Sequence, residues 1–492
     1  MVNRASLARL NESNTTFMMT PQFSFQTVLR LGVAVLLSGL MSAYATERPG
    51  TPPNVIVIMT DDQGAGDMGC YGAKDLMTPN MDGLARHGVR FTQFYSGAPV
   101  CSPSRAAFLT GRYPLRAGLI GNATSQPNGH EGLPKEQITL AQMFKAAGYA
   151  TAHIGKWHLG YTPQTLPNAR GFDFSFGHMG GCIDNYSHFF HWHGPIQHDL
   201  FRNGIEIQSP GRYFPDLMVE EAGQFLEHNQ KKPFFIYFAL NMPHYPYQGE
   251  PRWLEHYKEL PSPRNFYAAF LSSCDERIGS LLKKVESLGL RDNTIIVFQS
   301  DNGHSTEERA LSGGGSAGGY RGQKFSLFEG GIRLPAIISW PGHLPEGQVR
   351  TQAVHSCDWM PTLAELCGVK LLNPDIDGRS MTSVIRSEAA PSSHKVLHWH
   401  VGGAKQEQWA VLEGNWKLIG NVQSALDPEL TVQDKRLFLS NLATDASEKT
   451  NQAAQHPEIV QHLQRLHEEW LAASKITLKA ESSTQDKNGN ER

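Results

Sequence analysis

The fold class of this chain follows from one segment, Asn54-Val55-Ile56-Val57-Ile58-Met59-Thr60-Asp61-Asp62. Its run of consecutive apolar residues, most of them β-branched, predicts a strand that is buried on both faces. Similar runs occur at residues 150–154, 234–239, 294–299 and 335–340. Helical patterns lie between them at 138–148, 216–229 and 266–288, and another follows the last run at 359–367. This alternation predicts an α/β fold with a large, mostly parallel sheet flanked by helices.

The pattern changes after about His394. Short β-like segments follow at 396–400, 408–412, 416–419 and 436–439, and residues 457–474 have the periodicity of an amphipathic helix. This predicts a smaller α+β domain with an antiparallel sheet and one helix. We therefore divide the chain into a leader at 1–45, a larger domain at 46–390, the smaller domain at 391–475 and a disordered tail at 476–492.

The composition is that of an ordinary globular protein, with 40% hydrophobic and 18% charged residues among 492. The 44 basic and 47 acidic side chains nearly cancel, so the charge does not indicate nucleic acid as a partner. Six cysteines in a chain of this length do not form a disulfide framework. Whether Cys357 and Cys367 are bridged stays open.

The N-terminal region has the features of a signal peptide. Arg30 precedes an apolar run at 31–45, and Ala43-Tyr44-Ala45 fits a small-x-small cleavage site. We expect cleavage near Ala45 and a periplasmic or secreted protein. The run is too short for a confident membrane span, so no stable membrane insertion is expected. A core helix is the alternative, and the true start codon stays open.

Polar residues directly follow four of the predicted strands. The segments are Asp61-Asp62, Gly155-Lys156-Trp157-His158, Asn241-Met242-Pro243-His244 and Asp301-Asn302-Gly303-His304. Ligands bind beyond the carboxyl ends of strands in a parallel sheet, so we expect the four segments to meet at one edge.

Two kinds of chemistry are present around these strand ends. Hard oxygen donors, which suit Ca²⁺ or Mg²⁺ rather than zinc, come from Asp61, Asp62, Asp301 and Asn302. Fixed positive charge and proton-transferring imidazoles, which suit an anionic substrate, come from Arg105, Lys156, Lys324, His158 and His244. Each residue alone is commonly structural, but their repetition at equivalent strand ends favours one shared site.

A further segment, Cys101-Ser102-Pro103-Ser104-Arg105, predicts the start of a helix. Ser102 suits the N-cap and Pro103 suits a first helical position. Cys101 then lies at a helix N-terminus, where backbone amides favour negative charge, and Arg105 adds a positive charge on the same face. A thiol there is either a low-pKa nucleophile or a buried structural cysteine.

This segment, with Thr110-Gly111-Arg112 after it, resembles the cysteine-type signature of the sulfatase family, in the alkaline-phosphatase-like superfamily. Asp61-Asp62, residues 155–160, Asp301-Asn302-Gly303 and residues 322–332 also resemble family motifs. The resemblance implies that 46–390 is the catalytic domain. It also implies that a maturation enzyme oxidises Cys101 to formylglycine (3-oxoalanine), whose hydrated aldehyde is the nucleophile.

The same resemblance implies the roles of the site residues. The ligands of a divalent cation, typically Ca²⁺ with Mg²⁺ as the alternative, would be Asp61, Asp62, modified Cys101, Asp301 and Asn302. The sulfate pocket would contain Arg105, Lys156, His158, His244 and Lys324. His244, with or without Lys324, would protonate the leaving oxygen, and His158 would take a proton when sulfate is released. Some family members also place a serine in the pocket; here Cys182, Asp184 and Ser187 all stay open for that position.

The segment 180–193 is rich in histidine and aromatic residues. We expect it at the pocket mouth, with Trp192 offering a flat face to a sugar ring. The candidate substrate-binding residues are Asp184, His188, His191, Trp192 and His193. Zinc binding and ordinary packing are the alternatives.

The sequence thus predicts a sulfatase, with a sulfated carbohydrate as the preferred substrate. A phosphodiesterase or phosphonate monoester hydrolase on the same scaffold is the first alternative. A non-catalytic binder of sulfated glycans is the second. The sugar, the sulfate position, exo or endo cleavage, the oligomeric state and the conversion of Cys101 stay open.

Overall fold

The computed structural model describes residues 51–125, 132–190, 196–402, 407–423 and 430–474. Within them lies an 11-stranded sheet in the order β12 (Gln348–Arg350), β2 (Val89–Tyr95), β11 (Arg333–Ser339), β10 (Thr294–Ser300), β1 (Asn54–Thr60), β9 (Phe234–Ala239), β3 (Ala150–Lys156), β4 (Phe174–His178), β7 (Phe201–Arg202) and β8 (Ile205–Glu206), with β13 (Val354–His355) paired with β2. The central strands β10, β1, β9, β3 and β4 are parallel. The predicted α/β fold with a mostly parallel sheet is confirmed.

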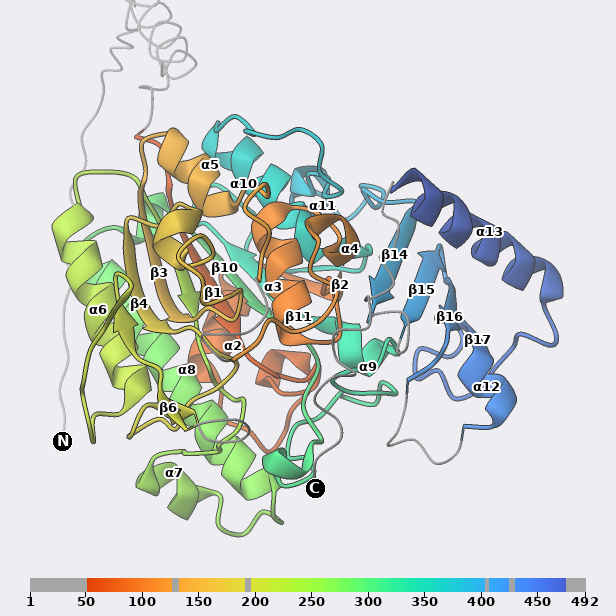
Figure 1. Cartoon of the computed structure of the whole chain (residues 1–492), viewed down its shortest axis with the longest axis horizontal. Coiled ribbons are helices and arrows are strands. Elements are labelled where there is room, and N and C mark those ends of the chain that lie inside the picture. The colour runs from red at the N-terminus through yellow and green to blue at the C-terminus, as the bar shows by residue number, and fades with distance from the viewer. Residues whose placement is uncertain (1–50, 126–131, 191–195, 403–406, 424–429, 475–492) are drawn as a thin grey trace, which may run out of the picture. The chain divides into compact units, whose positions relative to one another are not determined.

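The apolar run of β1 is continuous because both of its faces are buried. Val55, Val57 and Met59 pack on the layer formed by α3 (Cys101–Thr110), α5 (Leu140–Ala146) and α10 (Trp359–Cys367). Ile56 and Ile58 pack on the opposite layer, formed by α2 (Pro79–Arg86), α6 (Phe214–Asn229) and α8 (Arg264–Ser287). Figure 1 shows the sheet between these two helical layers. Side chains alternate across a strand, so a strand covered on both sides needs apolar residues at successive positions.

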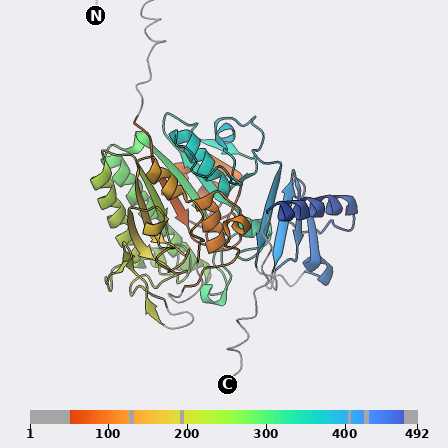
Figure 2. The same cartoon turned by 45° about the horizontal axis from the view of Figure 1, so that its top comes forward.

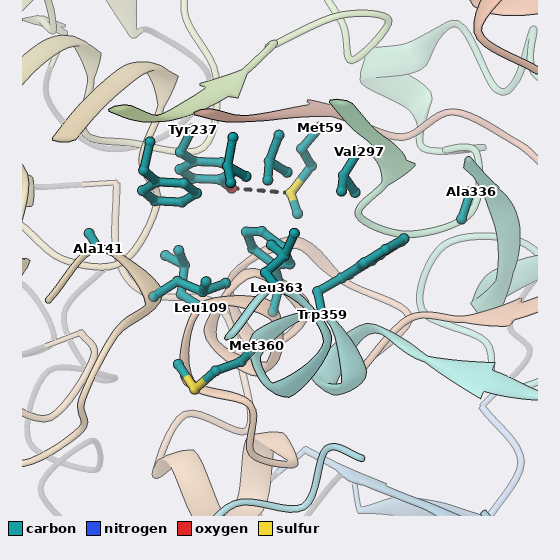
Figure 3. Packing of buried hydrophobic residues seen from close by; sticks show 14 of the residues in the cluster. Met59, Leu109, Ala141, Tyr237, Val297, Ala336, Trp359, Met360 and Leu363 are labelled. Carbon is teal, nitrogen blue, oxygen red and sulfur yellow. Dashed lines mark hydrogen bonds between the residues drawn. The ribbon is translucent and has the colours of Figure 1, made fainter. Parts of the chain in front are cut away.

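The first layer holds α3 against the centre of the sheet. Figure 3 shows Trp359 and Leu363 of α10 and Leu109 of α3 facing Met59, Tyr237 and Val297, which come from three neighbouring strands. The Trp359 indole N–H also donates to Gln299 Oε1 at 2.7 Å. This packing fixes the N-terminus of α3, where Cys101 lies, beside the strand ends.

A second, four-stranded sheet lies near the C-terminus. Its antiparallel strands are β14 (Val396–Val401), β15 (Gln408–Glu413), β16 (Trp416–Gly420) and β17 (Leu437–Asn441). Helix α13 (Pro457–Ala473) crosses one face, where Val460 and Leu463 contact Val411, Leu418 and Leu439 (Figure 2). The predicted antiparallel sheet with one long helix is confirmed.

Some elements differ from the prediction. Strands β2 and β4 carry mixed polar and apolar residues, and the sequence did not predict them. Strand β11 is antiparallel to both β10 and β2, although its apolar run matches those of the parallel strands. An apolar run reports burial and does not encode strand direction. The shorter elements are α4 (Pro114–Ala117), β5 (Phe189–Phe190), β6 (Gln197–His198), α7 (Pro251–His256), α9 (Glu329–Ile332), α11 (Thr382–Arg386) and α12 (Val432–Arg436).

Both sheets belong to one compact unit, and the domain boundary at 390 stays a prediction. The predicted leader at 1–45 and tail at 476–492 lie outside the described residues. Within the described ranges, no helix is long and apolar enough to cross a membrane. All six cysteines fall in the described chain and none is in a disulfide, so Cys357 and Cys367 are not bridged.

Candidate active site

The four strand ends meet, as the parallel sheet requires. Asp61 and Asp62 follow β1, Asp301 follows the neighbouring β10, and Lys156 ends β3. The segment after β9 joins them, since the Asp61 N–H donates to the Met242 carbonyl at 3.0 Å. The backbone N–H of Asp62 donates to Asp301 Oδ1 at 3.1 Å, and Lys156 Nζ lies 2.7 Å from Asp61 Oδ2. Segments separated by more than 200 residues are therefore in direct contact.

A buried ion-pair network forms the inner part of the site. Arg105 Nη2 lies 2.7 Å from Asp301 Oδ2 and 3.5 Å from Asp61 Oδ1, and all three side chains are fully buried. Burial alone would raise the pKa of Asp61, but the charges of Lys156 and Arg105 hold it below its usual value. The network keeps positive charge next to the position of Cys101.

Asp62 is less fully compensated than its neighbours. Its Oδ1 accepts from Asn302 Nδ2 at 2.7 Å, and its Oδ2 lies 2.9 Å from Lys324 Nζ. Even so, burial raises the pKa of Asp62 to about 7, with the nearby carboxylates of Asp61 and Asp301 adding to the effect. The charge of Lys324 therefore does not offset the burial of this carboxylate.

These residues fit a hard divalent cation. Ligand atoms of Asp61, Asp62, Cys101 and His244 lie within 4.8 Å of one another. The amide oxygen of Asn302 is buried and has no hydrogen-bond partner among the described residues. Ca²⁺ and Mg²⁺ bind carboxylate and amide oxygens. A cation here would give the Asn302 oxygen a partner and would balance the charge of the Asp62 carboxylate.

The group differs in one respect from the predicted ligands. His244 belongs to it, whereas Asp301 does not. The Asp301 carboxylate accepts hydrogen bonds from the Arg105 guanidinium and from the Asp62 backbone instead.

Cys101 is the first residue of α3, so the expected cap is wrong. The N-cap is Val100, which has no side-chain capping bond. The Ser102 hydroxyl instead donates to the His158 carbonyl at 2.6 Å and accepts from the Ala123 N–H at 3.0 Å. Helix entry is thus set by tertiary contacts around Ser102.

The Cys101 thiol is not a low-pKa nucleophile. Burial raises its pKa to about 12, outweighing the nearby lysines. Its Sγ lies 3.7 Å from Asp61 Oδ1. A neutral thiol among carboxylates is poor at nucleophilic attack and a poor ligand for a hard cation.

The two histidines have different surroundings. His244 Nδ1 lies 2.7 Å from the Tyr245 carbonyl, which leaves Nε2 to face Lys324 Nζ at 3.2 Å. His158 Nε2 lies 3.1 Å from the Ala123 carbonyl, and its buried Nδ1 has no partner among the described residues. Burial and the nearby cations hold the pKa of both imidazoles well below 6.5, so both are neutral in the free protein.

A cleft of about 290 Å³ opens onto this centre. Of the predicted residues, Cys101, His158, His244 and Lys324 line it, while Arg105 and Lys156 lie behind them in the buried network. Sequence reasoning missed several lining residues: Asn122, Ser125, Tyr245, Glu307, Arg309 and Phe325. Three of them, Tyr245, Glu307 and Arg309, come within a few residues after the predicted strand-end motifs. Their position close to these motifs could have indicated that they line the site.

Two predicted substrate-binding residues do not line the cleft. The Asp184 carboxylate accepts from the Ser187 N–H at 2.7 Å and from the Tyr186 N–H, so it holds its own turn together. His188 is buried, with Nε2 3.0 Å from the Arg212 carbonyl. His191, Trp192 and His193 lie outside the described residues.

Of the residues left open for the serine position, Cys182 lines the cleft and Asp184 and Ser187 do not. The zinc interpretation of 180–193 rests in part on residues outside the described chain, and no described residue of that segment belongs to a group that could hold a metal. The site lies at the carboxyl edge of a parallel sheet and combines carboxylates able to hold a cation, buried cations and two imidazoles. This combination defines a hydrolase of anionic esters.

Comparison with known proteins identifies the kind of ester. The family model described as Sulfatase matches residues 53–369, and the one described as N-sulphoglucosamine sulphohydrolase, C-terminal, matches residues 319–470. Arylsulfatase A from Homo sapiens is 36% identical over 374 residues, covering 71% of this chain and 70% of that protein. N-acetylgalactosamine-6-sulfatase from Rattus norvegicus is 35% identical over 347 residues, covering 68% and 64%.

The structural comparison agrees. The crystal structure of Ps i-CgsB in complex with k-i-k-neocarrahexaose has a TM-score of 0.77 and 30% identity, covering 89% of this chain and 96% of that one. The chain belongs to the sulfatase family, of the alkaline-phosphatase-like superfamily. It is a sulfuric ester hydrolase, and its family generally uses a formylglycine and a divalent cation.

Proposed function

We propose that this sulfatase removes sulfate from a sulfated carbohydrate, using formylglycine formed at Cys101 and a bound Ca²⁺. One observation carries the proposal. Cys101 lines the cleft, at the N-terminus of α3, with Asp61 at 3.7 Å and the Arg105–Asp301 pair directly behind it. The encoded thiol suits neither attack nor hard-metal binding at this place, whereas an aldehyde hydrate suits both.

Asp61, Asp62, Asp301 and Asn302 would hold the cation together with modified Cys101, and His244 lies beside them. When bound, Ca²⁺ supplies positive charge that stabilises charge building up on the sulfate oxygens. Formylglycine supplies a hydroxyl nucleophile as its hydrate.

The chain's own cations bind and orient the sulfate group. Lys324 reaches the cleft, while Lys156 and Arg105 are fixed behind it by Asp61 and Asp301. Because these charges are buried and already ordered, they need little rearrangement as negative charge develops. A sulfate ester has a poor leaving group, so the departing alkoxide also needs a proton.

His244 and Lys324 are placed to give that proton together: the Lys324 ammonium carries it, and His244 Nε2, which is unprotonated in the neutral imidazole, can accept it and pass it on. Lys324 Nζ lies 3.2 Å from His244 Nε2, and both side chains line the cleft. His158 would act as base at a separate position, since its Nδ1 has no partner within the described residues. In sum, one water is consumed, and an alcohol and inorganic sulfate are released.

A carbohydrate substrate is supported by two relatives. One is named for an N-acetylgalactosamine sulfate, and the Ps i-CgsB structure contains k-i-k-neocarrahexaose. The exposed ring of Phe325 adds an apolar surface at the cleft that suits the face of a sugar. Export to the periplasm or medium is proposed on the leader at 1–45. A formylglycine-generating enzyme is the proposed partner that converts Cys101.

The test combines one mass measurement with one comparison of substrates. Peptide mass across Cys101 should report an aldehyde in protein produced together with the maturation enzyme. That protein should hydrolyse an aryl sulfate and defined sulfated saccharides much faster than the phosphate diester of the same aryl alcohol. Faster turnover of the phosphate diester would favour the phosphodiesterase alternative. Activity confined to small aryl sulfates would contradict the carbohydrate assignment.

A further inference from the structure

The outer cleft contains a positive charge that the proposed mechanism does not use. Arg309 lines the cleft, and its side chain is 39% exposed. The inner cations Arg105, Lys156 and Lys324 are by contrast 0–3% exposed. Arg309 can therefore contact a bound molecule without belonging to the inner site.

Two contacts hold the Arg309 guanidinium in place. Its Nη2 lies 2.8 Å from Glu307 Oε1, and its Cζ lies 5.3 Å from the ring centroid of Tyr245, which also lines the cleft. Glu307 is its one hydrogen-bonding partner among the described residues, and a guanidinium carries five N–H donors. Donors remain for a ligand, and the contacts with Tyr245 and Glu307 order the group before binding.

Negative charge on the described lining of the outer cleft comes from one side chain. Glu307 is the only acidic side chain among the described residues that line it. Its other oxygen, Oε2, lies 3.3 Å from Lys324 Nζ, which also pairs with Asp62 at 2.9 Å. An anion that entered beside Arg309 would meet the N–H donors that Glu307 leaves unpaired.

We propose that Arg309 binds a second anionic group of the substrate, a sulfate or a carboxylate. The inference rests on the proposed function and narrows its substrate class to saccharides with at least two anionic groups. Lys324 and Arg309 contact the two oxygens of one carboxylate. The second anion therefore lies on the sugar that carries the cleaved ester or on an adjacent sugar. Arginine suits this role because its planar fork pairs with two oxygens of a sulfate or carboxylate.

The test measures kcat/KM on three matched disaccharides: one with a single sulfate, one with a second sulfate, and one with a carboxylate in its place. We expect the enzyme to prefer a two-anion substrate by roughly tenfold or more, mainly through KM. Arg309→Gln should remove that preference, and Arg309→Lys should keep part of it. The control is Arg212→Gln, since Arg212 is 54% exposed, pairs with Glu220 and does not line the cleft. It should leave the preference intact.

The two substrates with two anionic groups show whether Arg309 binds a second sulfate or a carboxylate. A preference for either one supports the proposal. The proposal would be overturned if the enzyme without substitutions had the same kcat/KM on all three disaccharides. An Arg309→Gln protein that loses activity equally on all three substrates would also overturn it, because that result indicates a structural role. If Arg309→Gln does not fold, the partial preference of Arg309→Lys decides the matter. The proposed function itself would be contradicted by a different result. In that case the enzyme without substitutions, and with Cys101 converted to formylglycine, would release sulfate from none of the three disaccharides.

Discussion

Two buried clusters of carboxylates and cations can be compared in this molecule. One is the active-site cluster of Asp61, Asp62 and Asp301 with Arg105, Lys156 and Lys324. The other, which we call the inter-sheet cluster, consists of Glu329, Lys417 and Glu448. Each contains one carboxylate whose pKa burial raises to about 7, Asp62 in the first and Glu448 in the second. Burial alone therefore does not distinguish a catalytic cluster from a structural one.

The difference lies in how completely the polar atoms are paired. In the inter-sheet cluster, Lys417 Nζ lies 2.8 Å from Glu329 Oε1 and 3.2 Å from Glu448 Oε1. Tyr95 donates to the other oxygen of Glu329, and the Glu329 N–H donates to the other oxygen of Glu448. The active-site cluster instead leaves Asn302 Oδ1 without a partner among the described residues. Complete pairing fits a structural role, and a buried oxygen left unpaired beside several carboxylates fits a cation ligand.

The largest expected effect is on catalysis. Cys101→Ala should lower kcat/KM by about 10⁴-fold or more, because the nucleophile is lost. Its unfolding midpoint should stay within about 4 °C of the unmodified protein, since few packing contacts change. Cys274→Ala is the matched control: this buried cysteine lies in α8 and not in the cleft, so activity should persist. Full activity in Cys101→Ala would contradict the mechanism.

Breaking the inter-sheet cluster should have the largest effect on stability. Lys417→Met leaves Glu329 and Glu448 buried without their shared cation, and should cost about 3–5 kcal/mol in denaturant unfolding. The control Lys258→Met breaks the exposed Lys258–Glu255 pair and should cost less than about 1 kcal/mol. Equal losses in the two variants would show that the inter-sheet cluster does not hold the two sheets together.

Calcium should stabilise the active-site cluster only. Ca²⁺ at a hundredfold excess over its dissociation constant should raise the unfolding free energy of chelator-treated protein by about 2.7 kcal/mol. Asn302→Leu, which removes the orphaned oxygen, should reduce this gain, whereas Lys417→Met should retain it. Calorimetric scans with and without Ca²⁺ measure both changes. A gain that is unchanged in Asn302→Leu would remove Asn302 from the ligand set.

The smallest expected effect concerns pH. Burial raises the pKa of Glu448 from 4.5 to about 7, so the folded protein binds a proton that the unfolded chain releases between these values. This contribution to stability is complete below about pH 4.5 and is lost as pH rises through 7. Glu448→Gln keeps an acceptor for the Glu329 N–H and should flatten the decline between pH 5 and 7 by roughly 2 kcal/mol. Urea titrations at several pH values measure the unfolding free energy of both proteins. If it fell equally with pH in both, the raised pKa would not belong to Glu448.

Much of the active-site cluster could be predicted from the sequence, because its residues stand next to apolar runs. Asp61 and Asp301 directly follow β1 and β10, and adjacency along the chain becomes adjacency in space at the edge of a parallel sheet. The inter-sheet cluster had no such signal. Glu329, Lys417 and Glu448 come from segments far apart in the chain, and no periodicity relates them.

The errors have a similar cause. Ser102 has the composition of an N-cap, but its hydroxyl bonds to His158 and Ala123, which are distant in sequence. Asp184 and His188 are polar residues near the cleft in sequence, yet local turn bonds and burial turn them away from it. Residue type reports what a side chain can do, and its neighbours decide which possibility is realised.

By itself, the amino-acid sequence determined the α/β class, the strand-end origin of the site and the unusual place of Cys101. These depend on local patterns: apolar runs that must be buried, and polar residues that follow them. Only the tertiary structure decided which carboxylates are fully paired, which oxygen is left for a cation, and that Arg309 lines the cleft beside Tyr245. Pairing energies in a buried site depend on separations of a few ångströms between distant segments, and those separations exist only after the chain has folded.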